Sequence, residues 1–122
     1  MSKILIIDDL ATEIQIMKTV VASLGHTVVT ANDGETGYAS AKVDKPDIIL
    51  LDVVMPKMDG FQTCRKIKKD PETAGIPIIL VTTKNQDTDR SWGLKQGAAD
   101  FVAKPFKSEE LAARITALLK AA

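Results

Sequence analysis

Short runs of consecutive apolar residues constrain the fold of this chain more than any other feature. The clearest run extends from Ile48 to Leu51 and contains no polar residue. A strand that faces water on one side alternates apolar and polar residues, whereas a strand buried on both faces of a parallel sheet is apolar throughout. Similar runs, rich in aliphatic or β-branched residues, lie at residues 3–7, 27–31, 76–81 and 100–103. We therefore expect a parallel sheet that is covered on both faces.

Segments with helical spacing separate these strands. Ile14, Met17, Val21 and Leu24 recur at intervals of three and four residues, and Gly25 then ends the pattern. Further helices are expected around residues 34–44, 59–69 and 85–96, and from residue 108 onward. Five alternations of strand and helix predict an α/β protein with a three-layer sandwich. The flavodoxin-like strand order 2-1-3-4-5 satisfies the right-handed crossover rule and places the ends of the first and third strands side by side.

Length and composition narrow the possible functions. The 122 residues fit one domain, spanning residues 1–122, and we expect no output domain. The 16 basic and 16 acidic residues balance, so there is no electrostatic case for a nucleic-acid partner. The single cysteine, Cys64, fits a reducing compartment. We expect no signal peptide, because a predicted strand begins at residue 3, and no apolar run approaches the roughly 20 residues that span a bilayer. These features predict a soluble, cytoplasmic domain that does not enter a membrane.

Ionisable or hydroxyl side chains follow four of the predicted strands. Asp8 and Asp9 follow the first strand, Asp52 the third, Thr82 the fourth and Lys104 the fifth. Because the carboxyl ends of parallel strands meet at one edge of the sheet, these five side chains are expected to converge. A lone Asp after a strand is often a helix cap. Two adjacent acids at the rim of a core repel each other, and capping needs only one of them.

This set of side chains is suited to phosphoryl transfer. Three carboxylates in one pocket raise each other's pKa values unless a cation lies among them. Mg²⁺ prefers one or two carboxylates together with water and phosphate oxygens. An Asp can then accept a phosphoryl group while Thr82 donates a hydrogen bond and Lys104 neutralises charge. Because no residue is an obvious general base for water, the aspartyl phosphate should hydrolyse slowly. That behaviour is typical of a timed switch rather than a turnover enzyme.

Four motifs resemble the receiver domains of two-component response regulators, and together they extend over most of the chain. They are residues 6–9, 50–60, 80–83 and 101–106. The resemblance implies that Asp52 is the phosphoacceptor, and that Asp9 and Asp52 bind Mg²⁺ directly. It implies that Asp8 acts mainly through a water molecule and that the backbone carbonyl of Val54 completes the protein ligands.

The resemblance also assigns the switch residues and the partners. Thr82 is the hydroxyl that moves toward the phosphoryl group, Phe101 the aromatic that turns inward with it, and Lys104 the phosphate partner. A histidine kinase, CheA-like in a chemosensory system, is the expected donor. A downstream protein is expected to bind the surface of the fourth helix, fifth strand and fifth helix. The chain would be a monomer or weak dimer that catalyses only its own phosphorylation and dephosphorylation.

Two further features refine this resemblance. The family often has a cis peptide where this chain has Lys104-Pro105. It usually has Ala or Gly where this chain has Thr83, so the larger side chain is expected to narrow access to the phosphoryl group. Residues 82–98 are similar to the stand-alone receivers of the PilH type, which serve chemosensory systems that control type IV pilus motility, also called twitching. A role in flagellar chemotaxis is the competing interpretation.

Three other functions fit the sequence less well. A receiver-fold binding module that works without phosphorylation is the first, but such modules usually lose one of the five functional residues that are intact here. A phosphatase of the haloacid dehalogenase type places two acids in a D-x-D pattern, whereas Asp8 and Asp9 are adjacent. A flavodoxin has a Ser/Thr-rich phosphate loop after its first strand, where these acids would repel phosphate.

Two of the predicted helices differ in how firmly they should pack. The helix over residues 59–69 places Phe61, Cys64 and Ile67 on one side, and its basic residues should form a solvated face. The helix over residues 85–96 has only Trp92 and Leu94 as large apolar residues. It should be the least firmly attached helix and the one that a switch moves most easily.

Overall fold

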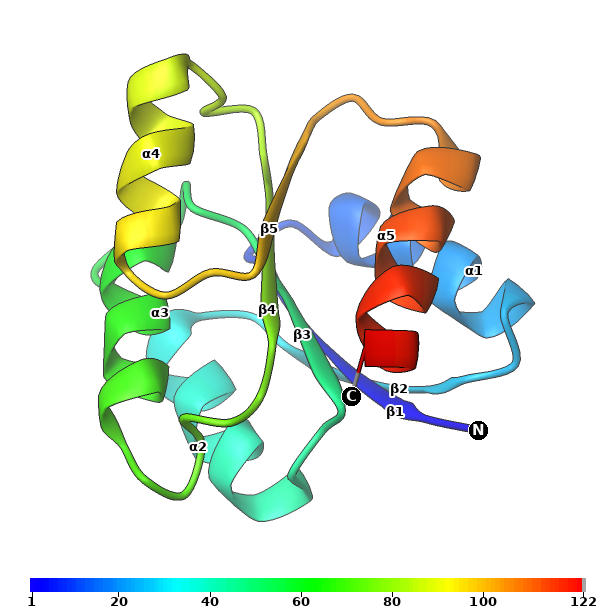
Figure 1. The fold of residues 1–122 in the computed structure, drawn as a ribbon, viewed down its shortest axis with the longest axis horizontal. Helices are drawn as coiled ribbons and strands as arrows, with labels where there is room; N and C mark the ends of the chain where they lie inside the picture. The colour runs from blue at the N-terminus through cyan, green and yellow to red at the C-terminus, as the bar shows by residue number, and fades with distance from the viewer. Residues whose placement is uncertain (122) are drawn as a thin grey trace.

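A five-stranded parallel sheet runs through the centre of the structure, a computed structural model that describes residues 1–121 (Figure 1). The strands are β1 (Lys3–Ile7), β2 (Thr27–Ala31), β3 (Ile48–Leu51), β4 (Ile78–Thr82) and β5 (Asp100–Ala103). The helices are α1 (Ala11–Ser23), α2 (Gly34–Asp44), α3 (Gly60–Lys69), α4 (Asp87–Lys95) and α5 (Ser108–Ala121). The strand order is β2-β1-β3-β4-β5, with every neighbouring pair parallel. The predicted fold class is confirmed.

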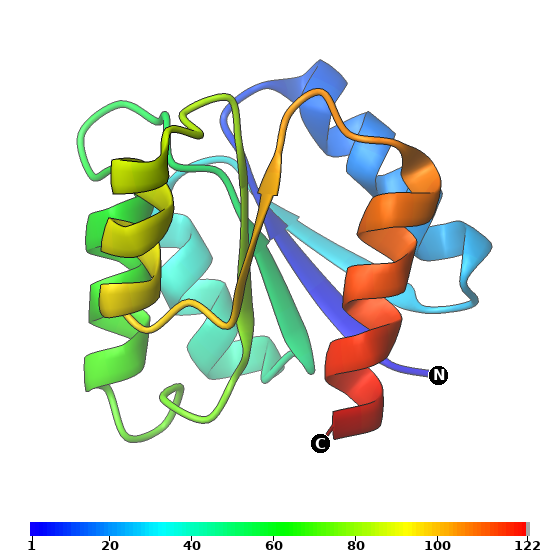
Figure 2. The same cartoon turned by 45° about the horizontal axis from the view of Figure 1, so that its top comes forward.

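Helices cover both faces of the sheet. In Figures 1 and 2, α2, α3 and α4 lie on one face, and α1 and α5 on the other. Each face has its own apolar cluster, because successive strand residues point to opposite sides. On the first face Leu5 and Ile49 pack with Phe61 of α3. On the second, Ile4 and Ile48 belong to the cluster that also contains residues of α1 and α5. No helix within residues 1–121 is long and apolar enough to cross a membrane.

The register of the strands brings their carboxyl ends to one level. Ile7 of β1 is paired with Leu51 of β3, and the N–H of Asp52 donates to the carbonyl of Ile7 at 3.0 Å. At the other side of the sheet, the N–H of Lys104 donates to the carbonyl of Thr82 at 2.9 Å. Residues that follow β1, β3 and β5 therefore emerge side by side with the end of β4.

Two elements begin two residues later than predicted. β4 begins at Ile78 rather than residue 76, because Pro77 has no N–H to contribute to the sheet. α4 begins at Asp87 rather than residue 85. The polar residues before it contain no apolar periodicity that would mark where the helix starts.

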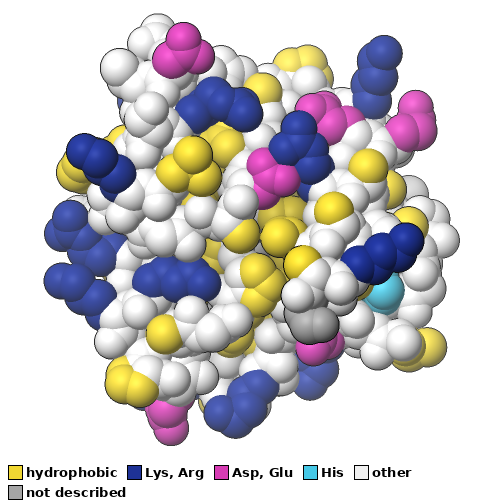
Figure 3. Space-filling view, viewed as in Figure 1, with side chains coloured by type: hydrophobic (Ala, Val, Ile, Leu, Met, Phe, Trp, Pro, Cys, Tyr) yellow, Lys and Arg dark blue, Asp and Glu magenta, His cyan; other side chains and the backbone are white. Residues whose placement is uncertain are grey.

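The basic face predicted for α3 is only partly solvated. Figure 3 shows Lys and Arg side chains gathered on the side of the molecule where α3 and α4 lie, and Arg65 and Lys69 are exposed. Lys68 is half-buried, and its Nζ donates to the carbonyl oxygens of Ala74 at 3.1 Å and Ile76 at 2.6 Å. Burial lowers the pKa of this ammonium. Lys68 therefore fastens the loop before β4, which corrects its assignment to a solvated face.

Candidate functional site

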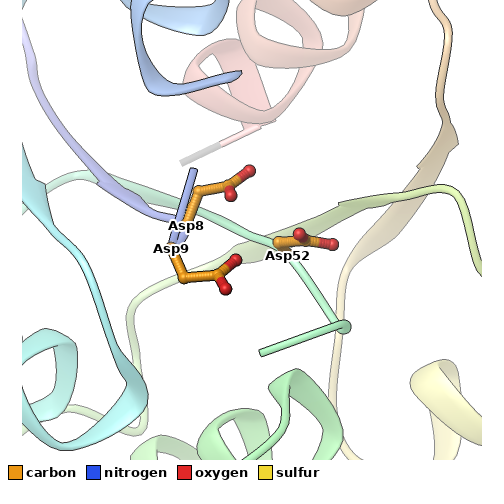
Figure 4. A group of neighbouring side chains, drawn as sticks. All are labelled: Asp8, Asp9 and Asp52. Atoms are coloured by element: carbon orange, nitrogen blue, oxygen red, sulfur yellow. The ribbon is translucent and has the colours of Figure 1, made fainter. Parts of the chain in front are cut away.

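Three carboxylates meet where β1 and β3 end (Figure 4). Asp8 and Asp9 follow β1 and Asp52 follows β3, and one oxygen from each lies within 4.8 Å of the others. Asp8 and Asp52 are buried, whereas Asp9 is exposed. The convergence expected from the strand ends is present in the structure.

Lys104 lies beside two of these three carboxylates. Its Nζ lies 2.8 Å from Asp8 Oδ2 and 3.7 Å from Asp52 Oδ2, and its side chain is almost fully buried. Burial opposes the charge of this lysine, but its hydrogen bond to Asp8 and the nearby carboxylate of Asp52 leave its pKa above the ordinary value. Burial raises the pKa of Asp52, partly offset by Lys104, and Asp8 raises it further. The site thus carries an excess of negative charge around one cation.

The two strand-end acids of β1 have different surroundings. Both oxygens of Asp8 have partners, because Oδ1 accepts the N–H of Leu10 at 3.0 Å and Oδ2 accepts Lys104. Asp9 is exposed at the mouth of the site. Oδ1 of Asp52 accepts the N–H of Val54 at a long 3.3 Å. Asp9 and Asp52 are thus the carboxylates best able to turn an oxygen toward a cation, and an all-oxygen set fits Mg²⁺ rather than zinc.

Thr82 ends β4, the strand beside β3, and Phe101 lies on β5, the next strand in the sheet. Thr82 is buried, and its Oγ1 accepts the N–H of Lys84 at 3.1 Å. Phe101 is buried, with the guanidinium of Arg90 centred 5.1 Å from its ring centroid. The aromatic ring therefore occupies the inward position in this structure. Thr83 is exposed beside them. The peptide bond between Lys104 and Pro105 is cis, as expected.

A close backbone approach fixes the chain around Asp52. The N–H of Gly60 donates to the carbonyl of Val53 at 2.9 Å, which brings the start of α3 against the residue after the acid. A Cβ at Gly60 would lie only 2.2 Å from the carbonyl oxygen of Asp52. Asp59 caps the same helix, because its Oδ1 accepts the N–H of Gln62 at 2.9 Å. The Asp-Gly pair thus holds the loop that carries Asp52.

Glu13 is a further member of the site that was not predicted from the sequence. Its Oε1 lies 3.1 Å from Nζ of Lys104, so this lysine contacts a third carboxylate. In the sequence, Glu13 looks like an ordinary acid in the first turn of a helix. A usable signal was present, because α1 begins directly after Asp9 and Leu10 and its first turn must lie at the same edge of the sheet.

Comparisons with known proteins agree with this geometry. The profile of the response regulator receiver domain matches residues 4–116. Protein PilH of Pseudomonas aeruginosa is 46% identical over 119 residues, which are 98% of each chain. Chemotaxis protein CheY4 of Vibrio cholerae superposes with a TM-score of 0.90 at 30% identity, covering 97% of this chain and 98% of that one. A sensor histidine kinase receiver domain of P. aeruginosa, solved with magnesium coordinated in its active-site cleft, gives the same TM-score and identity and 98% coverage of both chains. The chain belongs to the response regulator receiver domain family.

Proposed function

We propose that Asp52 accepts a phosphoryl group from a histidine kinase and that this chain acts as a timed switch. The observation that carries the proposal is the placement of Asp52, a buried acid at a strand end beside Lys104 and two further carboxylates. Receiver domains are regulators, so we assign the chain no catalysis beyond its own phosphorylation and dephosphorylation.

In this proposal the carboxylates divide their roles according to their surroundings. Asp9 and Asp52 would bind Mg²⁺ directly, with the carbonyl of Val54, because their oxygens are the least engaged. Asp8, whose oxygens both have partners, would act mainly through a water molecule. Bound Mg²⁺ supplies positive charge to the phosphoryl oxygens during transfer.

Transfer to Asp52 needs a nucleophile and stabilised charge rather than a base. A carboxylate oxygen of Asp52 attacks phosphorus, and the bond from phosphorus to the kinase histidine nitrogen breaks, with its electron pair returning to the imidazole. Lys104 balances the charge on the phosphoryl oxygens and Thr82 donates a hydrogen bond to one of them. Phe101 would stay inward as Thr82 moves toward the phosphoryl group.

Loss of the phosphoryl group should be slow. Water must attack phosphorus, the bond to Asp52 must break, and the products are the free carboxylate and inorganic phosphate. The other carboxylates of the site are engaged with Lys104 or proposed to bind the cation, so none of them is free to take a proton from water. Thr83, the exposed residue after Thr82, would further restrict the approach of water in this proposal.

The relatives favour a particular pathway, and the output surface is proposed from the family resemblance. The likeness to PilH supports a role in a chemosensory system that controls type IV pili, with flagellar chemotaxis as the alternative. The downstream target would bind α4, β5 and α5. The stand-alone organisation, the cytoplasmic location and the state of monomer or weak dimer stay predictions. A receiver-fold module that works without phosphorylation remains the second candidate.

The test is intact-mass spectrometry after incubation with Mg²⁺ and acetyl phosphate. We expect the native protein to gain one phosphoryl group and Asp52→Ala to gain none. Asp87→Ala, which removes an exposed acid at the start of α4, is the matched control and should be modified like the native protein. A native protein that stays unmodified would contradict the proposal and favour the phosphorylation-independent module.

A further inference from the structure

We propose that Glu13 is a positioning residue that competes with the phosphoryl group for Lys104. The inference rests on the proposed function, because it concerns the lysine assigned there to the phosphoryl group. Its structural basis is a third ion pair on that lysine, at 3.1 Å between Glu13 Oε1 and Lys104 Nζ. Lys104 is 6% exposed and Glu13 30%, so this pair is partly shielded from water.

Glu13 differs in position from the other two acids around Lys104. Asp8 and Asp52 follow strands and belong to the carboxylate cluster that could hold a cation. Glu13 lies on α1 and, within residues 1–121, is not part of that cluster. It can therefore act on the lysine without being a metal ligand.

The distances show where the ammonium is held. Lys104 Nζ is within hydrogen-bonding distance of Asp8 at 2.8 Å and of Glu13 at 3.1 Å, but it is 3.7 Å from Asp52. A phosphoryl group on Asp52 would place new anionic acceptors in that gap. In the proposal the ammonium turns from Glu13 to these acceptors, and its contact with Glu13 lengthens. Glu13 thus stabilises the arrangement that the unmodified protein adopts.

A divalent cation should strengthen this effect. Positive charge among Asp8, Asp9 and Asp52 offsets the attraction that Asp8 and Asp52 exert on the lysine. Glu13 then remains the carboxylate whose charge is not offset, so its hold on Lys104 decides how easily the ammonium reaches the phosphoryl group.

Glu13→Gln should change two affinities in opposite directions. With Mg²⁺ saturating, beryllofluoride, which mimics the phosphoryl group, should bind about two- to fivefold more tightly, the effect expected from losing one partly exposed ion pair. Without the mimic, Mg²⁺ should bind more weakly to this variant for two reasons. A negative charge near the site is lost, and the ammonium of Lys104, released from Glu13, moves toward Asp52 and competes with Mg²⁺ for its carboxylate. A purely structural role for Glu13 would weaken both.

The measurements are ¹⁹F NMR for beryllofluoride and calorimetry for Mg²⁺. Glu13→Asp keeps the charge but withdraws the carboxylate by one methylene. If the contact with Lys104 matters, its beryllofluoride affinity should match that of Glu13→Gln. An affinity equal to that of the native protein would mean that only the charge matters, which would contradict the inference. Glu109→Gln removes an exposed acid at the start of α5 and is the control. In a Lys104→Met background, Glu13→Gln should leave beryllofluoride affinity unchanged.

Two results would overturn the inference. One is unchanged or weaker beryllofluoride binding in Glu13→Gln. The other is the same gain with and without Lys104, which would mean that Glu13 acts through charge alone. If the native protein binds no beryllofluoride, the proposed function fails. The proposed competition for Lys104 then fails as well. The Mg²⁺ titrations would then still show whether Glu13 acts on Lys104, so the two failures can be told apart.

Discussion

Helices α3 and α4 cover the same face of the sheet but are held to it very differently (Figure 2). α3 buries Phe61, Cys64 and Ile67, all three of which belong to the apolar core. α4 buries only Gly93, while Trp92 is 47% and Leu94 53% exposed. The stability of a helix on a sheet depends mainly on the apolar area that it buries. α4 therefore has much less holding it in place.

The few contacts that hold α4 lead toward the functional site. A Cβ at Gly93 would lie 2.5 Å from Cδ1 of Leu80 and 3.5 Å from Cδ2 of Phe101, so the helix rests directly on β4 and β5. Arg90 adds its guanidinium over the ring of Phe101. Phe101 is three residues before Lys104. The loosely attached helix α4 thus packs on β5, the strand that ends at the functional site, whereas α3 is firmly packed in the core.

Truncating the large aromatic residue of each helix should give the largest contrast. Phe61→Ala removes a core side chain and should lower the free energy of unfolding by about 3–5 kcal/mol. Trp92→Ala removes a half-exposed side chain and should change it by less than about 1 kcal/mol. Urea denaturation followed by circular dichroism measures both. Equal losses would show that α4 is anchored as firmly as α3.

Adding one methyl group to the buried glycine of each helix should give a smaller contrast. At Gly60 the new Cβ meets backbone atoms of Asp52 and Val53 at 2.2 and 2.5 Å, which cannot move aside, so Gly60→Ala should cost about 1–3 kcal/mol. At Gly93 it meets the end of the Leu80 side chain, which can rotate.

For Gly93→Ala the better helix propensity of Ala, about 1 kcal/mol, offsets part of the strain. The net change in the free energy of unfolding of Gly93→Ala should therefore be small. Thermal unfolding of both variants measures the difference, and Mg²⁺ titration should show a loss only for Gly60→Ala, because only this substitution displaces Asp52. If Gly93→Ala loses more stability than Gly60→Ala, α4 cannot shift to accommodate the methyl group. The conclusion that α4 is the more loosely attached helix would then be wrong.

Sequence patterns were sufficient for the fold and for the meeting of the strand-end residues. The apolar run ending at Asp52 located a buried strand, and the geometry of parallel sheets then placed its end beside Asp8. Pairings between a helix and a distant loop were not accessible in this way. The sequence places the first turn of α1 at the same edge of the sheet as Lys104, but it does not show that the side chain of Glu13 is the one that reaches this distant lysine. Lys68 looked like any surface lysine until the loop before β4 supplied carbonyl oxygens for it.

The smallest effect that we predict is a change in the fluorescence of Trp92, the only tryptophan. Its neighbour Gly93 rests on Phe101, so a change at the end of β5 should shift α4 by a small amount. Phosphorylation can favour the shifted state only through contacts that differ between the two states, here those of the phosphoryl group with Thr82 and Lys104. Because Trp92 is partly exposed, a small movement alters its contact with water and hence its emission.

We expect the emission maximum to move when beryllofluoride is added with Mg²⁺ and to stay constant in Asp52→Ala. Cys64 on α3 supplies the matched control, because burial raises the pKa of its thiol to about 11 and its Sγ lies against the carbonyl of Gln96 at 3.6 Å. Its alkylation at neutral pH should be slow before and after the mimic is added, since α3 does not move. If ¹⁹F NMR shows the mimic bound while Trp92 emission is unchanged, α4 is not the moving part. Rapid alkylation of Cys64 on adding the mimic would instead mean that α3 moves together with α4. The proposed difference between a mobile α4 and a fixed α3 would then be wrong.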